Sequence, residues 1–546
     1  MPLDSSLDLT GDPRFVKVSA SDVSGAYACG RFLALKTRPA VKAVNGWRRL
    51  YAPWDEKTPF PLGDVLELVR EADGRDFAAY QDQAKWLAAA IDGRKVHRLL
   101  RAYVSLAVEN ILDAHQSIMD EVGRLRLLPG ELWAGTAARK LTAWAPLYET
   151  GDRVREIRRI RLGSARADED SARWSLVAAY VAAESRAGKP PVRVRVVEIG
   201  ALDGSIAVLF DGTAGEARSA FAESGRRLAV AAAEEDHVVP CRSCGECKGA
   251  GSCRSLVSVD GMLGQPGRGH SSRSVSPGDL EKYATCPAQW LLSSCLHLPS
   301  EAGGGDAAAR GLAVHQWLKA AHSRGVPCAR ADLPAPGSGL GLADGILTES
   351  EYEAAYPLLL QHAGQCPLAG DAVLVVADDN VYGYDHDAEV VPVIRPDLMY
   401  RSGDRLVIRE FKTAEQPYES GRADAYEKHP QVAFSLAMLN AGLARHHGAS
   451  SAAVELELIT AAGQSVWTWE ADDPAVASVA AGTLGRAVAD WHEDSTWATR
   501  PGPHCAWCPV RRWCPDVDAW QQAGAGAPAA LFPAPPAAED DDSPPF

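Results

Sequence analysis

The sequence Ile394-Arg395-Pro396-Asp397, followed after a short turn by Arg409-Glu410-Phe411-Lys412-Thr413, decides the fold of the second half of this 546-residue chain. Residues 390–400 and 405–411 are rich in Val, Ile and other strand-forming residues, and the Ser-Gly-Asp at 402–404 is a tight-turn signal. The pattern predicts a β-hairpin. Because strand side chains alternate between faces, Glu410 and Lys412 share one face, and Asp397 lies on the neighbouring strand within reach of Glu410.

This arrangement suits the metal-dependent cleavage of a phosphodiester. Asp397 and Glu410 can share a hard divalent cation such as Mg²⁺, which prefers oxygen ligands. Such a cation lowers the pKa of an attacking water and polarises the phosphodiester, and Lys412 can orient the water and stabilise charge on a phosphate oxygen. A Glu-x-Lys pair is also common on exposed strands as a solvated salt-bridging face, so the motif alone leaves both interpretations open.

The elements predicted around the hairpin alternate between helices and strands. Helices are predicted at residues 311–321, 349–361 and 425–443, with a last one ending near 491, and further strands at 373–377, 453–460 and 466–470. This order predicts a mixed sheet flanked by helices, an α/β layer architecture. His315 lies on the first helix, where it could supply a nitrogen ligand, and Gln431 lies on the helix that follows the hairpin.

A cysteine pattern occurs twice in the chain. In each half, a lone cysteine precedes a C-x2-C-x5-C triplet by roughly two hundred residues, and the lone cysteines share similar contexts, Ala-Tyr-Ala-Cys and Tyr-Ala-Thr-Cys. The two sets are Cys29 with Cys244, Cys247 and Cys253, and Cys286 with Cys505, Cys508 and Cys514. The repetition predicts two tandem copies of one fold, each closed by a four-thiolate metal site.

Taken in order, the motifs of the second half resemble the RecB-like branch of the PD-(D/E)XK nucleases. The resemblance is stronger to its iron–sulfur members: AddB-type nuclease domains, eukaryotic exonuclease V and the CRISPR-associated RecB-like exonucleases. It covers about residues 278–516 and implies a 4Fe–4S cluster on Cys286, Cys505, Cys508 and Cys514, and Mg²⁺ or Mn²⁺ on His315, Asp397 and Glu410. It also implies a catalytic Lys412 and sets Gln431 in the family's Gln-x3-Tyr motif. That motif is incomplete here, because Ser435 stands where Tyr is usual.

All-thiolate sites suit zinc as well as iron–sulfur clusters. Zinc sites more often use two local pairs of ligands, whereas here one ligand is remote and three are local, and the resemblance favours 4Fe–4S. In the first half, Cys241 and the triplet could instead form a local zinc knot that leaves Cys29 unused. Cys295, Cys328 and Cys366 have no partner by spacing and are expected in the core.

The first half is expected to be a degenerate, inactive copy. Matching the Gly-Asp-Arg at 151–153 to that at 403–405 sets Asp397 against Ala145, Glu410 against Arg158 and Lys412 against Ile160. On this alignment the copy keeps the fold and the cluster but lacks the catalytic carboxylates. The basic run at residues 153–161 suits either phosphate contacts along a groove or a solvated strand.

The domain boundaries follow from composition. Residues 1–255 form the degenerate domain, 256–277 a Gly- and Ser-rich linker, 278–516 the nuclease domain, and 517–546 a disordered Pro/Ala-rich acidic tail. Hydrophobic residues make up 46%, enough for packed cores, and no signal peptide or transmembrane pattern is seen, which predicts a soluble cytoplasmic protein without a membrane partner. The net charge of −15 argues against non-specific wrapping of duplex DNA, although a basic channel can exist inside an acidic protein.

The last seven residues, from Asp540 to Phe546, resemble the C-terminal tip of bacterial single-stranded-DNA-binding proteins. There, acidic residues precede a terminal Pro-Phe that docks into pockets of partner proteins. The resemblance implies recruitment of a protein partner, and an ordinary solubilising tail is the alternative.

Together these features predict a Mg²⁺- or Mn²⁺-dependent DNA nuclease, an exonuclease acting on single-stranded DNA or DNA ends in repair, recombination or defence. The sequence has no G-x-x-x-x-G-K-[ST] loop, so any unwinding has to come from a helicase partner. One alternative is a non-catalytic iron–sulfur module that binds DNA and recruits repair proteins through its tail; the intact Asp397, Glu410 and Lys412 argue against it. Another is a zinc-ribbon regulatory protein.

Overall fold

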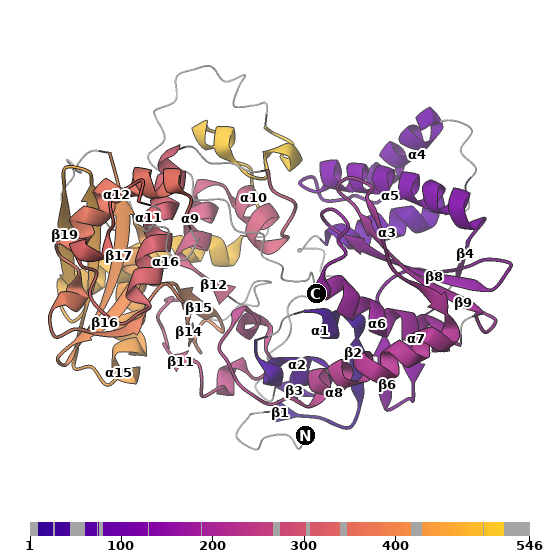
Figure 1. Cartoon of the computed structure of the whole chain (residues 1–546), viewed down its shortest axis with the longest axis horizontal. Coiled ribbons are helices and arrows are strands. Elements are labelled where there is room, and N and C mark those ends of the chain that lie inside the picture. Colours follow the sequence, from indigo (N-terminus) through magenta and orange to yellow (C-terminus); the bar gives the residue numbers. More distant parts are fainter. Residues whose placement is uncertain are drawn as a thin grey trace.

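The structure is a computed structural model. It describes residues 9–25, 28–43, 60–73, 75, 80–128, 130, 132–186, 188–265, 274–301, 306–338, 347–415, 429–494 and 496–517. Two lobes lie side by side, one made by the first half of the chain and the other by most of the second half (Figure 1). The acidic tail predicted at the C-terminus lies outside the described residues from position 518 onward.

The second lobe is built on a five-stranded sheet with the order β13-β16-β17-β18-β19. Its strands are β13 (Val373–Val376), β16 (Leu398–Ser402), β17 (Arg405–Thr413), β18 (Ser451–Thr460) and β19 (Gly463–Glu470). β16 and β17 form the predicted hairpin, β17 and β18 run parallel, and the outer strands pair antiparallel. Parallel neighbours need a crossover, and α14 (Pro430–Met438) supplies it.

Helices cover both faces of this sheet. On one face α14 packs with α9 (Pro277–Thr285) and α16 (Pro474–Glu493), and on the other lie α11 (Asp306–His322) and α12 (Glu349–Ala363). Smaller elements are α10 (Pro287–Trp290), a π-helical turn (Leu439–Leu443) that continues α14, and α15 (Ala444–His446). The alternation of apolar residues predicts this α/β sandwich, and the structure has it.

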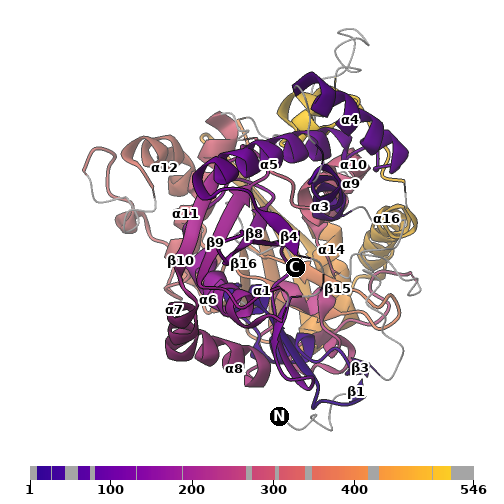
Figure 2. The same ribbon diagram turned by 90° about the vertical axis from the view of Figure 1, so that its right-hand side faces the viewer.

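The first lobe is built on a second five-stranded sheet, with the order β10-β9-β8-β7-β4. Its strands are β4 (Arg126–Leu128), β7 (Leu147–Glu149), β8 (Val154–Arg161), β9 (Arg193–Gly200) and β10 (Ile206–Thr213). The crossover between parallel β8 and β9 is α6 (Glu169–Glu184). Figure 2 shows α6 on one side of this sheet and α5 (Arg101–Val122) on the other.

Other elements complete the first lobe. Its helices are α1 (Ala20–Ser24), α2 (Gly30–Lys36), α3 (Pro61–Ala72), α4 (Tyr80–Gly93), α7 (Ala214–Ala220) and α8 (Arg226–Glu234). Its small strands are β1 (Leu9–Thr10), β2 (Val16–Ser19), β3 (Lys42–Ala43), β5 (Trp133–Gly135) and β6 (Arg139–Thr142).

The two sheets have the same connectivity. In each, an antiparallel hairpin leads into a strand that runs parallel to the next one through a single helical crossover, and an antiparallel strand follows at the edge. The hairpins are β7–β8 in the first lobe and β16–β17 in the second.

The segment expected to link the halves is partly folded into the second lobe. β11 (Val257–Ser258) pairs with β14 (Val381–Tyr384), and β12 (Ser274–Val275) pairs with β15 (Val391–Ile394). The buried carboxylate of Asp385 accepts hydrogen bonds from the N–H groups of Gly261 (3.1 Å) and Leu263 (2.8 Å). The linker therefore starts the second lobe instead of merely preceding it.

Two predicted elements differ from the structure. The single strand expected at 390–400 is interrupted at Arg395-Pro396-Asp397, so β15 and β16 belong to different sheets. Proline cannot donate a ladder hydrogen bond, which explains the break. The helix expected from residue 425 begins at Pro430 within the described residues, and residues 416–428 lie outside them.

Each cysteine-rich segment packs against the opposite half. The loop of residues 241–253 packs with Tyr382 and Tyr384 of β14, and at the other end the Trp513 ring contacts the Tyr103 ring of α5 edge to face at 5.2 Å. Asp516 also forms an ion pair with Arg98 at 3.0 Å. These contacts hold the two lobes together.

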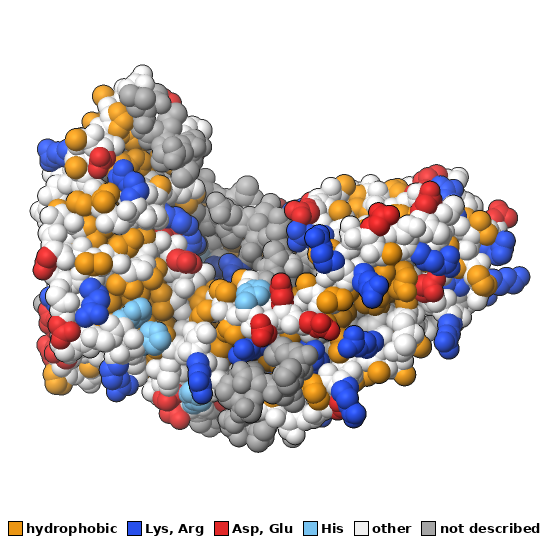
Figure 3. Space-filling view, turned by 60° about the horizontal axis from the view of Figure 1, so that its bottom comes forward, with side chains coloured by type: hydrophobic (Ala, Val, Ile, Leu, Met, Phe, Trp, Pro, Cys, Tyr) orange, Lys and Arg blue, Asp and Glu red, His pale blue; other side chains and the backbone are white. Residues whose placement is uncertain are grey.

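On the face shown in Figure 3, acidic and basic side chains are interspersed. No helix in the described part of the chain combines the length and the apolar character needed to cross a bilayer.

Candidate active site and cysteine sites

Three of the side chains that the sequence predicts as metal ligands lie together. Asp397 lies just before β16, and His315 comes from α11. Their Nδ1 and Oδ1 atoms are 2.9 Å apart, and the second oxygen of Asp397 accepts a 2.7 Å hydrogen bond from the N–H of Phe411. Glu410, the neighbour of Phe411 on β17, is 5% exposed and close enough to share a proton with Asp397. The strand interruption at Pro396 lets the chain turn Asp397 into this cluster.

Ionising Asp397 and Glu410 together is less favourable than ionising two isolated carboxyl groups, because their negative charges repel each other. Burial and the charge of Asp397 raise the pKa of Glu410 to about 8, against the opposing charge of Lys412. Burial alone would raise the pKa of Asp397 too, but the charges of His315 and Lys412 and two hydrogen bonds lower it below its ordinary value. Two buried acids this close stabilise one another's protonated form unless a cation lies between them.

The donor set has the chemistry of a divalent-cation site, although the ligand atoms of the three residues do not all lie within 4.8 Å of one another as the side chains stand. Two carboxylates and one imidazole offer oxygen and nitrogen atoms, and neighbouring ligands of an octahedral ion with bonds of about 2.1 Å lie about 3 Å apart. The 2.9 Å between His315 and Asp397 agrees with that separation. His315, Asp397 and Glu410 would hold the ion.

Lys412 lies on the same face of β17 as Glu410 and is partly exposed. Its charge reaches Glu281 on α9: burial raises the pKa of that carboxyl, and Lys412 opposes the rise. The sequence analysis missed Glu281. It lies five residues before Cys286, and no spacing in the sequence connects it to the hairpin.

Gln431 and Ser435 lie one turn apart on α14. The Oε1 of Gln431 and the hydroxyl of Ser435 are both buried, and neither has a hydrogen-bond partner among the described residues. Buried polar atoms without partners are uncommon and call for an explanation. They are at the position where the resemblance expected Gln-x3-Tyr.

Asp378 is a second acid that the sequence analysis did not single out. It follows β13, forms ion pairs with Lys319 (3.3 Å) and Arg395 (2.8 Å), and its charge contributes to the raised pKa of Glu410. Lys319 lies one turn after His315 on α11, so this helix presents two polar side chains to the same region.

α11 approaches β17 closely at Gly311. A Cβ there would lie 3.2 Å from Oγ1 of Thr413, tighter than ordinary contact. Glycine at this position therefore lets the helix carrying His315 lie near the strand carrying Glu410.

The four cysteines expected in the second lobe come together. Cys286 ends α9, and the triplet lies around two 3₁₀ turns, Pro503–Trp507 and Arg511–Trp513. Burial raises the pKa of Cys508 to about 12, and the charges of Cys286, Cys505 and Cys514 add to that rise. The four thiols therefore act on one another electrostatically although one of them is remote in sequence.

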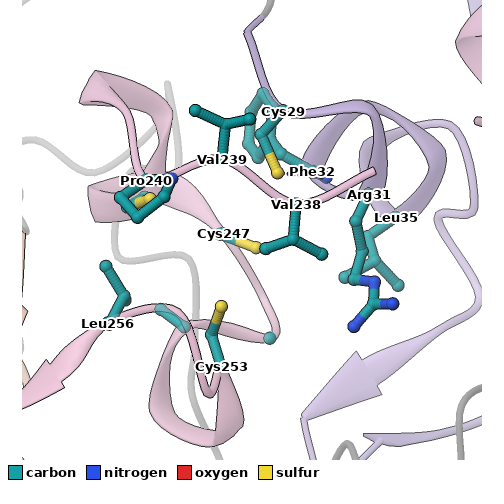
Figure 4. A pocket seen from close by; sticks show the side chains of 13 residues that line it. Cys29, Arg31, Phe32, Leu35, Val238, Val239, Pro240, Cys247, Cys253 and Leu256 are labelled. Carbon is teal, nitrogen blue, oxygen red and sulfur yellow. Dashed lines mark hydrogen bonds between the residues drawn. The ribbon is translucent and has the colours of Figure 1, made fainter. Parts of the chain in front are cut away.

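The four cysteines expected in the first lobe also meet. Cys29 caps the N-terminus of α2, and with Cys244, Cys247 and Cys253 it lines one pocket. Figure 4 shows the sulfur atoms of Cys29, Cys247 and Cys253 pointing toward the same space. Cys241 is not part of this lining, but its N–H donates to the Cys244 sulfur at 3.2 Å.

The basic strand β8 of the first lobe is neither a groove lining nor a solvated face, in contrast to both interpretations of the sequence. Arg155, Arg158 and Arg159 are buried. Arg155 donates to carbonyl groups of Ala182, Ser185 and Lys189 near the end of α6, and Arg158 pairs with Glu156 at 2.7 Å. These guanidinium groups therefore form hydrogen bonds and ion pairs inside the first lobe.

The side of the sheet on which each residue lies corrects, by one residue, the alignment of the two hairpins made from the sequence. Ile157 packs in the core with α6, as Ile408 packs in the core with α14, so the position of Glu410 corresponds to Arg159 and not to Arg158. By the same step, Lys412 corresponds to Arg161. Arg159 and Arg161 both pair with the buried Glu198, at 3.0 and 2.9 Å. An internal ion-pair network thus occupies the place where the second lobe has its acidic site.

Two cysteines assigned to the core by their spacing are buried but are not isolated. Cys328 and Cys366 lie with His322 and His362 in a group whose ligand atoms are all within 4.8 Å of one another. Cys295 packs at the edge of the large core cluster, as expected.

Comparison with known families supports this geometry. The model of the PD-(D/E)XK nuclease superfamily matches residues 274–515. This segment of the chain is therefore similar to the PD-(D/E)XK nuclease superfamily. Members of this superfamily are in general nucleases that use divalent metal ions and act on DNA, which agrees with the acidic cluster at Asp397 and Glu410. The match begins at β12 and ends after Cys514, so it spans the five-stranded sheet and the helices that cover it but leaves out β11. No curated protein matches the chain.

Proposed function

We propose that this protein is a metal-dependent deoxyribonuclease, an exonuclease of the RecB-like iron–sulfur branch that acts on single-stranded DNA or DNA ends. The observation that carries the proposal is that Asp397 lies against His315 and beside the buried Glu410, near Lys412, in the segment that matches the PD-(D/E)XK nuclease superfamily. Repair, recombination and defence all require such an activity.

Each side chain has a role in this chemistry. A divalent cation at the site would polarise the phosphodiester and lower the pKa of a bound water. Asp397 is fixed by the Phe411 N–H, which donates to one of its oxygens and leaves the other oriented toward His315. Lys412 would hold the attacking water and balance charge on a phosphate oxygen. The water oxygen bonds to phosphorus, the bond from phosphorus to the leaving nucleotide oxygen breaks, and that oxygen takes up a proton.

Gln431 is assigned to the same site in this proposal. Its buried Oε1 has no partner among the described residues, so a ligand could satisfy it without breaking an existing hydrogen bond. We assign it to contact with the DNA strand next to the scissile phosphate. Ser435 is too short to make the contact of the usual tyrosine, and the site should depend more on Gln431 in consequence.

Each cysteine quartet is proposed to hold a 4Fe–4S cluster. Among the described residues, only the His322 group brings three or more metal-binding atoms within 4.8 Å of one another. The quartets are therefore more widely spaced than the ligands of one zinc ion. Cluster thiolates bind separate iron atoms and need that wider spacing.

The first lobe is proposed to be a duplicated, non-catalytic copy. Its sheet repeats the connectivity of the second, and Arg159 and Arg161 stand where the acid and the lysine would be. With its arginines buried, its role is to support the second lobe through the reciprocal packing of the cysteine segments. Helicase and tail-binding partners remain consistent with this assignment and rest on the sequence alone.

The test is digestion of end-labelled single-stranded and duplex DNA with Mg²⁺ or Mn²⁺. Asp397→Ala and Lys412→Ala should each lower the rate at least about a hundredfold. Asp472→Ala and Lys85→Ala, which remove exposed charges elsewhere, are the matched controls. Unchanged cleavage in both site variants would reject this site as the nuclease centre, and a wild-type protein that binds DNA without cleaving it would favour the non-catalytic module. Product lengths distinguish exonuclease from endonuclease action.

A further inference from the structure

The second lobe contains a buried His₂Cys₂ group away from the acidic cluster. His322 ends α11 and Cys328 follows it, while His362 lies in the last turn of α12 and Cys366 follows that helix. All four side chains are 3% exposed or less. Their ligand atoms lie within 4.8 Å of one another, and no other group among the described residues meets that limit.

The spacing of these atoms matches a tetrahedral zinc ion. With bonds of about 2.05 Å to nitrogen and 2.3 Å to sulfur, tetrahedral geometry separates two nitrogens by about 3.3 Å and a nitrogen from a sulfur by about 3.6 Å. The Nε2 atoms of His322 and His362 are 3.1 Å apart, and the Cys366 sulfur is 3.7 Å from Nε2 of His322. An apolar core would not bring two imidazole nitrogens and two sulfurs so close.

Outer contacts orient one of the histidines for this role. Nδ1 of His362 is 2.9 Å from the buried carboxylate of Glu457, which also accepts from Arg409 at 3.1 Å. A metal-bound histidine commonly gives its second ring N–H to a carboxylate in this way. Nδ1 of His322 has no hydrogen-bond partner in the described part of the chain. The polar contacts of this ring are therefore made by Nε2, which faces His362 and Cys366.

We propose that His322, Cys328, His362 and Cys366 form a structural zinc site that fastens α11 to α12 behind β17. Two imidazoles and two thiolates are ligands that zinc favours, whereas Mg²⁺ requires oxygen. Four protein ligands in a closed, buried shell leave no open position for substrate, which makes the site structural. The ligands come as two local pairs, H-x5-C and H-x3-C, each at a helix end.

Binding of zinc would displace protons from this group, because the metal takes neutral imidazole and deprotonated thiolate. Hydrogen bonds from Cys328 and both histidines lower the pKa of Cys366, although burial opposes them. The pKa of His362 is raised to about 9: burial lowers it, but Cys366 and Glu457 outweigh burial. In the absence of metal, a buried thiolate and imidazolium would have to neutralise one another.

The site has a consequence for the neighbouring strand. Phe411 stands between Glu410 and Lys412 in the sequence. Its ring contacts the rings of His362 and His322, with centroids 5.0 and 5.7 Å away. His315 lies two helical turns before His322 on α11, on the same side of the helix. A zinc ion at the end of α11 therefore fixes the helix that carries His315. The zinc site itself does not depend on the nuclease activity.

The test is metal analysis of the full chain purified anaerobically, with zinc and iron counted per chain. Cys366→Ala should lose one zinc relative to wild type, while Cys295→Ala, a cysteine of the same lobe outside the group, and Asp397→Ala keep it. Zinc-edge X-ray absorption of the wild type should count two sulfur and two nitrogen neighbours, and it decides the matter if Cys366→Ala does not fold.

Three results would overturn the zinc site: wild-type protein without zinc, a folded Cys366→Ala variant with undiminished zinc, or zinc with four sulfur neighbours. The last result would assign the metal to a cysteine quartet. Loss of nuclease activity in Asp397→Ala with unchanged zinc would support both proposals separately, and inactive wild-type protein that still holds this zinc would count against the nuclease alone.

Discussion

The raised pKa of Glu410 makes the stability of the metal-free protein depend on pH. An isolated glutamate has a pKa near 4.5, and in the folded protein burial and Asp397 raise that of Glu410 to about 8. Between these values the folded carboxyl keeps its proton while the unfolded one loses it. The unfolded state therefore binds fewer protons, and the free energy of unfolding falls as pH rises.

The size of the effect follows from the two pKa values. Complete ionisation in the folded state costs on the order of 5 kcal/mol, and the part of it lost between pH 6 and pH 8 is about 2 kcal/mol. Glu410→Gln cannot ionise and should lack this loss. The informative quantity is the difference between the pH slopes of the two proteins, because the amide also changes stability at every pH.

Urea unfolding followed by tryptophan fluorescence, in buffers free of divalent cations, measures both slopes. Wild type should lose about 2 kcal/mol more than Glu410→Gln from pH 6 to pH 8. Saturating Mg²⁺ should restore the wild type more at pH 8 than at pH 6, because cation and proton compete for the same carboxylates. Parallel pH profiles for the two proteins, with equal effects of Mg²⁺, would refute the account of two coupled acids sharing one cation.

Two further variants test other parts of the molecule. Cys286→Ser should lose about half of the bound iron while Cys295→Ser keeps all of it, as counted after anaerobic purification; equal iron in both would remove Cys286 from the cluster. Glu198→Gln should destabilise the first lobe by about 3–5 kcal/mol in urea unfolding, because Arg159 and Arg161 lose a buried partner, and yet leave cleavage at low temperature intact. A change below 1 kcal/mol would show that the network is solvated.

Much of the second lobe can be predicted from the sequence because its signals are local. Turn residues at 402–404 and alternating apolar residues specify the β16–β17 hairpin, and the same alternation puts Glu410 and Lys412 on one face. The break before Asp397 is also local, since Pro396 stands there. Spacing within one strand and its neighbour is sufficient for this part of the site.

The remaining parts depend on contacts between distant segments. Glu281 meets Lys412 only because α9 packs on the face of the sheet that bears Lys412. The His322 group joins two helix ends that are forty residues apart. Its signal in the sequence is H-x5-C and H-x3-C, two short pairs that become one group only when the ends of α11 and α12 pack together.

The arginines of β8 show why residue type alone misjudges exposure. Five arginines in nine residues suggest a surface, but a guanidinium can be buried when carboxylates and carbonyl groups satisfy its donors. The partner Glu198 lies on β9, directly across the parallel pair from Arg159, and only the register reveals it.

β17 connects the two metal sites proposed for the second lobe. Its side chains alternate, so Glu410 and Lys412 point toward the acidic cluster while Arg409 and Phe411 point toward α12, where they meet Glu457 and the zinc-site histidines. An ion that fixes those histidines also restrains Phe411, whose N–H holds Asp397. The strand is thus anchored on the face opposite the reaction. A strand held in this way keeps Asp397 and Glu410 so close together that a cation is needed to balance their charges. In the first lobe, Arg159 and Arg161 balance the charge of Glu198 directly, so β8 needs no cation.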